Sequence, residues 1–165
     1  MDRLKRRLSD EQMAVFPNLR EGAYEVTSDA DWAYNCVAHA VGKKDLPWWP
    51  VEADTEGVFW PAGVDRAETA NAFAAAFCSV GYRPCEGSED GPGFIAGFEK
   101  VAIYVDAEGA PSHTAKQTEG GRWTSKLGEW EDIEHDALED LAGGPDGRLG
   151  YGQPGKYLIR EIRDP

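Results

Sequence analysis

Cysteine is scarce in this sequence. The 165 residues contain three cysteines, Cys36, Cys78 and Cys85, which cannot all pair with one another. No two of them have the short CxxC spacing of structural zinc sites, and a site built from all three and one histidine would lack it as well. We therefore expect no disulfide scaffold, no metal site and no other cofactor. Free thiols of this kind are typical of a cytoplasmic protein.

Positive charge and long apolar runs are also in short supply. The chain has 17 Lys and Arg against 30 Asp and Glu, which gives a net charge of −13. A field of this sign repels phosphate backbones and anionic lipid headgroups, so we expect neither nucleic acid nor a membrane as a partner. No apolar run is long enough to span a bilayer, and the basic residues at 3–7 lead into a polar stretch, unlike a signal peptide.

The apolar content is that of a folded domain. Hydrophobic residues make up 41% of the chain and aromatic residues 11%, with six tryptophans, so a core can offset the entropy of the chain. A length of 165 residues suits one domain. We expect a single domain over 1–165, with a lead-in segment at 1–28 and the core at 29–165.

Three segments have helical patterns. Apolar residues recur weakly over 1–15, and the compact segment 32–41 is followed by Gly42, a residue that commonly ends helices. The segment 65–81 has apolar residues at helical spacing. Between the last two, 46–61 contains three prolines and four large aromatic residues, which predicts an ordered loop.

The second half of the chain predicts an antiparallel sheet. The segment 100–105 is rich in β-branched and aromatic residues, and 112–117 and 122–126 complete a three-stranded meander with it. A short acidic helix is expected over 132–141 and a final strand over 157–162. Because helices precede antiparallel strands, we expect an α+β fold with N-terminal helices packed on the sheet.

Cys36 is the candidate nucleophile. Asn35 is a competent capping residue, so it predicts that Cys36 stands at the start of a helix, where the helix field favours a thiolate. His113 falls near the start of the middle strand of the meander and would approach the thiol from the sheet. A thiol beside an imidazole is typical of nucleophilic catalysis.

This order, a cysteine on an early helix followed by an antiparallel sheet with a histidine strand and then a tryptophan strand, resembles the papain-like cysteine peptidase superfamily. In those enzymes the strand after the histidine carries an aromatic residue and a polar orienting residue, and the segments 112–115 and 122–126 look like that arrangement. The segment 35–38 is also similar to the start of the cysteine helix in CHAP-type amidases. The resemblance implies a papain-like fold and a thiol-dependent hydrolase.

The chain also resembles a bacterial family without an established function. This resemblance is carried by four motifs and by His113. The motifs are Asn-Cys-x-Ala at 35–38, Trp-Trp-Pro at 48–50, Gly-Phe-Glu-Lys-Val-Ala-Ile-Tyr at 97–104 and Trp-Thr-Ser-Lys-Leu-Gly at 123–128. A later Trp-Pro stands at 60–61. The resemblance covers roughly 32–160 and brings no activity with it.

The chain departs from papain at two supporting positions. Papain-like enzymes take an oxyanion donor from a Gln shortly before the cysteine, and 29–34 contain none, so the Cys36 backbone N–H with the Asn35 side chain would have to replace it. No Asn lies on the strand after His113 to orient its ring. The candidates for that role are Asp132, which we favour, Ser125 and Gln117.

Other conspicuous residues have simpler interpretations. His39 lies one turn after Cys36, where it would compete with His113 for the thiol, and we expect it to line the core or a groove. His135 stands in an acidic segment, where we expect a solvated residue whose protonated form is favoured. Four tryptophans are expected either in the core or lining a substrate groove: Trp48, Trp49, Trp60 and Trp123.

Two functions from different classes follow. The first is a hydrolase or acyltransferase that acts on an amide bond of a protein or peptide, with Cys36 as nucleophile and His113 as base. The second is an acidic immunity or antitoxin-like protein that binds a cationic protein partner without catalysis. A papain-like binding domain that has lost its activity lies between the two.

Overall fold

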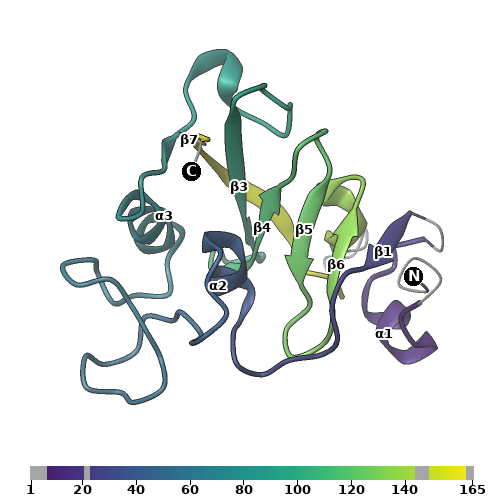
Figure 1. The fold of residues 1–165 in the computed structure, drawn as a ribbon, viewed down its shortest axis with the longest axis horizontal. Coiled ribbons are helices and arrows are strands. Elements are labelled where there is room, and N and C mark those ends of the chain that lie inside the picture. The colour runs from purple at the N-terminus through teal and green to yellow at the C-terminus, as the bar shows by residue number, and fades with distance from the viewer. Residues whose placement is uncertain (1–6, 21–22, 144–148, 163–165) are drawn as a thin grey trace.

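One antiparallel sheet organises the molecule (Figure 1). The computed structural model describes residues 7–20, 23–143 and 149–162. Its seven strands lie in the order β1-β6-β5-β4-β3-β7-β2. They are β1 Tyr24–Val26, β2 Arg83–Pro84, β3 Phe98–Val105, β4 Pro111–Gln117, β5 Trp123–Lys126, β6 Asp132–His135 and β7 Gln153–Glu161.

The helices are few and short. The α-helices are α1 Asp10–Val15, α2 Cys36–Val41 and α3 Ala70–Cys78, and the 3-10 turns are η2 Gly87–Glu89 and η3 Leu138–Leu141. Each α-helix begins at a polar capping side chain, Ser9, Asn35 or Thr69, that accepts a backbone N–H of the first turn. The fold is therefore a mixed one, in which short helices accompany a seven-stranded antiparallel sheet.

The helices α2 and α3 cover one face of the sheet. In Figure 1, α2 lies near one end of β4 and α3 lies to the left of it, beside β3. Helix α2 contacts β4 and β5, and α3 contacts β2, β3 and β7. Apolar residues of the two helices pack there on Val101, Ile103 and Leu158 from β3 and β7, together with Trp48 and Trp60 from the loop between the helices. We call this the α2 face.

The opposite face of the sheet packs on the N-terminal segment and η3. Its core contains Ala102, Tyr104, Ala115 and Trp123, which alternate along their strands with the residues of the α2 face. Leu8, Phe16, Leu19, Leu138 and Leu141 cover them from the other side. We call this the η3 face.

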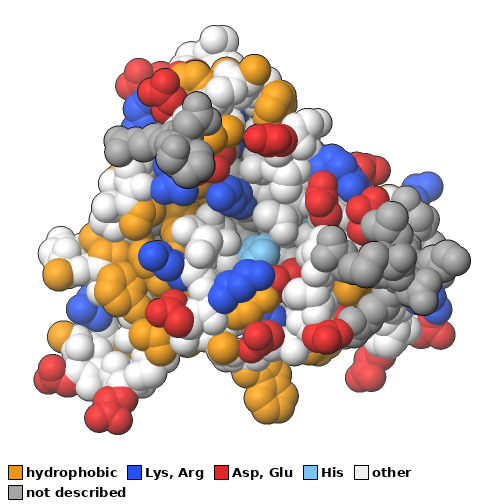
Figure 2. Space-filling model, in the orientation of Figure 1, with side chains coloured by type: hydrophobic (Ala, Val, Ile, Leu, Met, Phe, Trp, Pro, Cys, Tyr) orange, Lys and Arg blue, Asp and Glu red, His pale blue; other side chains and the backbone are white. Residues whose placement is uncertain are grey.

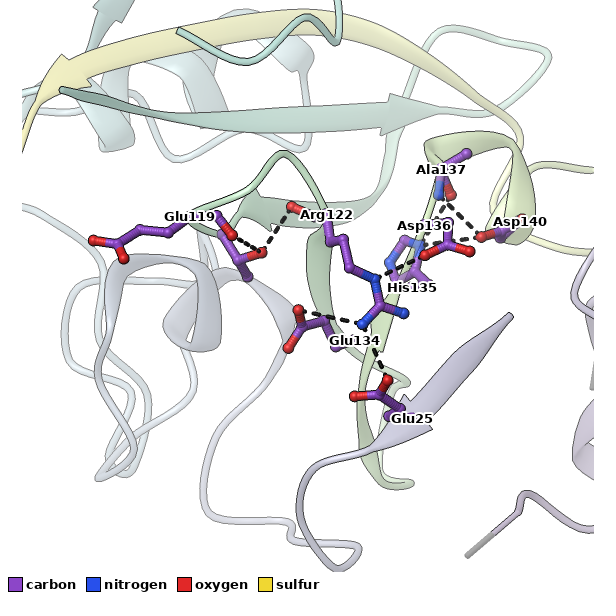
Figure 3. Close-up of polar contacts among 9 residues, drawn as sticks. Glu25, Glu119, Arg122, Glu134, His135, Asp136, Ala137 and Asp140 are labelled. Carbon is purple, nitrogen blue, oxygen red and sulfur yellow. Dashed lines mark hydrogen bonds and ion pairs between the residues drawn. The ribbon is translucent and has the colours of Figure 1, made fainter. Parts of the chain in front are cut away.

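A surface ion cluster holds strand β1 at its end of the sheet (Figure 3). The guanidinium of Arg122 lies 2.8 Å from Asp136, 3.3 Å from Glu25 on β1 and 3.5 Å from Glu134 on β6. Glu25 and Glu134 are direct cross-strand partners, so without a cation their like charges would repel each other. Arg122 therefore neutralises the pairing of β1 with β6.

Most of the predicted elements are present with altered limits. The meander over 100–126 is confirmed as β3, β4 and β5, and the predicted helix stop at Gly42 is confirmed by its left-handed backbone, φ 84°. The helix expected over 65–81 is shorter, because Thr69 caps it at Ala70. The lead-in helix is confined to Asp10–Val15, and residues 1–6 of that prediction lie outside the described residues.

The helix predicted over 132–141 is wrong. Residues Asp132–His135 form strand β6, and Leu138–Leu141 form a 3-10 turn. The acidic residues suggested a solvated helix, but Ile133 and His135 alternate into the core of the η3 face, which is strand periodicity over a segment too short to reveal it. Strand pairing with β5 and β1 determines the conformation here.

Substitution of Phe73 tests how much the packing on the α2 face contributes to stability. Its ring is 1% exposed and lies 5.2 Å from Trp49 and 5.4 Å from Trp60, centroid to centroid. We expect Phe73→Ala to lower the free energy of unfolding by about 3–5 kcal/mol, because it leaves a cavity between the two tryptophans. Urea unfolding measures this. The matched control is Phe94→Ala, at a side chain 44% exposed, which should cost less than about 1 kcal/mol.

Candidate functional site

Cys36 is the first residue of α2, as the sequence predicts. The Asn35 side chain accepts the backbone N–H of Ala38 at 3.1 Å and so begins the helix one residue before the thiol. The same side chain accepts the N–H of Trp48 at 3.0 Å and donates to its carbonyl at 2.8 Å. Asn35 therefore joins the start of α2 to the aromatic loop through one of its two amide N–H groups, and its oxyanion role stays a prediction.

The thiol of Cys36 lies against strand β4. It accepts hydrogen bonds from the backbone N–H groups of Thr114, Val37 and Cys36, whereas the Thr114 hydroxyl has no hydrogen-bond partner. The N–H of Thr118 points toward β5, and Thr114 lies four residues away on the same strand, so its N–H points the same way. Since β4 pairs with β5 only at Lys116 and Gln117, Cys36 takes the place of a strand partner for Thr114.

Burial determines the protonation of this thiol. The residue is half-buried as a whole, and burial raises the pKa of Cys36, although the Thr114 and backbone hydrogen bonds act in the opposite direction. The resting form is therefore a neutral thiol. The sequence predicts that the helix start and a neighbouring imidazole lower this pKa, but it is raised, so a nearby base must take the proton if Cys36 reacts.

His113 lies next to Thr114 on β4. Its side chain points to the η3 face, where the imidazole stacks on Tyr151 at 4.1 Å between centroids and an interplanar angle of 5°. It is 2% exposed, and neither ring nitrogen has a hydrogen-bond partner. Burial, and after it the neighbouring His135, lower the pKa of His113 well below its ordinary value. The ring is thus a neutral base whose nitrogens are both free, and no hydrogen bond joins it to Cys36.

Tyr151 connects the two candidate residues. Its ring stacks on His113, and the charge of a Cys36 thiolate would act on its hydroxyl: burial first and Cys36 second raise the pKa of Tyr151. Cys36 and His113 therefore lie near the same tyrosine but on opposite faces of β4, so this structure does not show the predicted approach of His113 to the thiol. Sequence reasoning missed Tyr151, because it stands in a Gly- and Pro-rich segment without periodicity before β7.

The three residues predicted to orient His113 bond elsewhere. The Asp132 carboxylate accepts the Tyr34 hydroxyl at 2.6 Å, and the Ser125 hydroxyl lies 2.8 Å from His135. The Gln117 amide donates to the carbonyl of Pro92 at 2.8 Å. None of the three contacts the His113 ring nitrogens, so their predicted orienting role has no contact behind it in this structure.

The tryptophans expected to line a groove are mainly core residues. Trp48 and Trp60 are 5% and 4% exposed on the α2 face, and Trp123 is 1% exposed on the η3 face. Trp49 is half-buried against Phe73. The groove role is therefore wrong for Trp123, which strand alternation turns into the core. Figure 2 shows that surface hydrophobic side chains gather on the side of α3, while acidic and basic side chains are interspersed elsewhere on this face.

The prediction of a solvated, protonated His135 is wrong as well. It is fully buried, with one ring nitrogen at Ser125 and the other 2.9 Å from the carbonyl of Ala137 (Figure 3). Burial lowers the pKa of His135 to about 4, against a smaller opposite effect of its hydrogen bond with Ala137. The acidic neighbours in the sequence predicted the reverse, but Asp132 and Glu134 alternate to the other face of the sheet, and burial of the ring outweighs the opposite effect of Asp136.

Two further findings concern groups of metal-ligating side chains and membrane-spanning helices. Among residues 7–20, 23–143 and 149–162, no three His, Cys, Asp or Glu side chains come together as metal ligands would. No helix in the described part of the chain is long and apolar enough to cross a membrane.

Comparison with known proteins identifies a family. Residues 25–159 match the family described as "Domain of unknown function (DUF7689)". No curated protein matches the chain significantly, and no solved structure does. The matched range contains Cys36 and His113. It also contains all residues of the seven strands except Tyr24 of β1 and the last two residues of β7.

Stability should fall as the solution is acidified. The pKa of His135 is depressed in the folded chain, so its contribution is present above the ordinary histidine pKa and is lost as the pH falls from about 6.5 to about 4. The loss from this one residue should reach about 3 kcal/mol. Urea unfolding at several pH values measures the slope, and His135→Gln should flatten it. His113 and His39, whose pKa values burial also lowers, retain part of the slope. An unchanged slope in His135→Gln would contradict this assignment.

Proposed function

This chain belongs to the DUF7689 family, and we propose that it is a thiol-dependent hydrolase or acyltransferase that acts on an amide bond of a protein or peptide. One observation carries the proposal: the Cys36 thiol, at a helix start, is hydrogen-bonded to Thr114, the residue directly after a buried histidine with two free ring nitrogens. An unpaired polar group in a core costs free energy, so a functional reason for His113 is favoured.

The protonation states support a general-base mechanism. Cys36 rests as a thiol and His113 as a neutral imidazole, because burial raises the pKa of the first and lowers that of the second. His113 takes the thiol proton as the sulfur attacks the carbonyl carbon, and it returns the proton to the amine that leaves. An acyl group then remains on Cys36 until water or an amine accepts it.

The backbone around Cys36 offers hydrogen-bond donors for this step. The N–H groups of Cys36, Val37 and Thr114 already point at the sulfur and stabilise negative charge that develops there. Since the Asn35 amide is engaged by Trp48, these backbone groups are the better candidates for the oxyanion site. The papain-like arrangement of helix, thiol and histidine strand is part of this proposal.

His113 must turn for the dyad to close. Its ring is stacked on Tyr151 and forms no bond with Cys36 in this form. Catalytic hydrogen bonds are often long or absent before the substrate binds. We propose that the substrate draws the ring away from Tyr151 toward the gap between β4 and β5, where Cys36 lies.

The acidic binding protein remains the second candidate because of one surface feature. Trp32 is 79% exposed and is flanked by the exposed residues Asp29 and Asp31. An exposed tryptophan among carboxylates suits a cationic protein partner, since tryptophan is enriched at binding hot spots. This function requires Trp32 and does not require Cys36.

Acylation of Cys36 tests the enzyme. Incubation with a pool of peptide thioesters, followed by mass spectrometry of tryptic fragments, should place the acyl group on Cys36. We expect His113→Gln to slow this acylation by about 10²- to 10⁴-fold, because the general base is lost. The control Cys78→Ser, at an exposed thiol on α3, should keep the wild-type rate.

Two results would contradict the proposal that the chain is a thiol-dependent enzyme. One is acylation spread evenly over the three cysteines, and the other is a rate that His113→Gln leaves unchanged. Full binding of a cationic protein by Cys36→Ala, together with its loss in Trp32→Ala, would instead support the acidic binding protein.

A further inference from the structure

His39, on α2, is hydrogen-bonded to a hydroxyl at one ring nitrogen and lies at ion-pair distance from a carboxylate at the other. His39 Nε2 lies 2.9 Å from the Thr124 hydroxyl on β5, and His39 Nδ1 lies 3.4 Å from Asp132 Oδ2 on β6. The three side chains come from different elements and converge on the α2 face. Their order, hydroxyl then imidazole then carboxylate, is the arrangement of a nucleophile, its base and the group that orients the base.

The carboxylate determines which nitrogen of His39 carries the proton. Asp132 is 1% exposed, and it accepts the Tyr34 hydroxyl and faces Lys126, whose Nζ is 3.9 Å away. A proton on His39 Nδ1 faces the Asp132 side chain, and the geometry therefore favours this tautomer. Nε2 then has a free lone pair and accepts the hydrogen bond from the Thr124 hydroxyl. Burial lowers the pKa of His39, so the ring rests as the neutral base.

This chain of groups opens on a pocket. His39 and Thr124 line a cavity of about 350 Å³ together with Phe98, Lys116 and Ile162. A larger cavity of about 800 Å³ shares Lys116, Glu99 and Ile162 with it and extends across β7 to the end of α3. The first cavity has the volume of a small-molecule site.

We propose that Thr124, His39 and Asp132 form a second catalytic site, independent of Cys36, that transfers the acyl group of a small ester onto Thr124. Thr124 is half-buried, so its hydroxyl remains within reach of the pocket. Lys116 supplies positive charge beside it and is held by Glu99 at 3.3 Å. Phe98 and Ile162 provide apolar contacts for a short acyl chain.

The chemistry balances with water as the co-reactant. The Thr124 oxygen forms a bond to the ester carbonyl carbon while its proton passes to His39 Nε2. The bond from that carbon to the alcohol oxygen breaks, and the alcohol leaves with the proton from His39. Water then attacks the acyl group, its proton returns through His39 to the Thr124 oxygen, and a carboxylic acid is released. Asp132 positions the ring and stabilises its charged form.

The experiment uses the full chain carrying Cys36→Ala, so that the thiol cannot take part. With p-nitrophenyl acetate and p-nitrophenyl butyrate, we expect a burst of p-nitrophenolate close to one equivalent, and peptide mapping should place the acyl group on Thr124. Adding His39→Gln should reduce the burst rate by about 10²-fold or more. Thr124→Val should abolish the adduct, and Thr124→Ser should restore it. The control Thr55→Val, at an exposed hydroxyl in the loop between α2 and α3, should change nothing.

Asp132 has its own readout as a positioning residue. Asp132→Asn should lower the burst rate at saturating ester with little change in KM, and Asp132→Glu should recover part of it. The proposal is overturned if the acyl group appears on lysines and not on Thr124, or if His39→Gln leaves the rate at Thr124 unchanged. Because Cys36 is absent throughout, failure here leaves the thiol proposal standing, and failure of the thiol proposal leaves this one standing.

Discussion

The separation of β5 from β4 is the constraint on which the rest of the α2 face depends. The two strands pair through only two residues of β4, after which β5 diverges and leaves the Thr114 N–H without a strand partner. A buried N–H must find an acceptor. The Cys36 sulfur is that acceptor, so the open position in the sheet seats the start of α2. The Asn35 side chain then connects this helix start to Trp48 and to the aromatic loop.

The same geometry divides the histidines between two environments. Strand alternation sends His113 to the η3 face with Tyr104 and Tyr151, while the side chain of Thr114 remains with Cys36 on the α2 face. His39 reaches Thr124 one turn further along α2. His113 has no hydrogen-bond partner at either ring nitrogen, whereas His39 is hydrogen-bonded to Thr124 at Nε2 and lies 3.4 Å from Asp132 at Nδ1. The free ring of His113 suits a site that forms only when the substrate binds. The bonded ring of His39 suits a site that is formed before the substrate binds.

Sequence reasoning was reliable where periodicity was long or a capping residue was present. The strands from 98 to 126 and the helix start at Asn35 follow from β-branched runs and from an Asn before a small-residue helix. It failed at 132–141, where four residues of strand are too few to show alternation and the acidic composition dominated. Strands β1 and β2 have three and two residues and no local signal, so only pairing with β6 and β7 defines them.

The candidate site was predictable in its residue types and not in their contacts. Asn35 and Cys36 stand at a helix start and His113 stands on a strand, as the sequence predicts. The partners of Asp132, Ser125 and Gln117 depend on strand register, because a shift of one residue would turn these side chains to the other face of the sheet. Tyr34 and Thr124, which complete the contacts of Asp132 and His39, carry no motif. Their role emerges only when α2 is laid across β5 and β6.

The central claim is that Cys36 and His113 act together, and a crystal structure of the chain acylated on Cys36 by a peptide thioester tests it most directly. The quantity to measure is the distance from the Cys36 sulfur to the nearer ring nitrogen of His113. The account predicts about 4 Å or less, with the imidazole rotated away from Tyr151. A His113 ring that still stacks on Tyr151, with both nitrogens unpartnered beside an acylated Cys36, would contradict it.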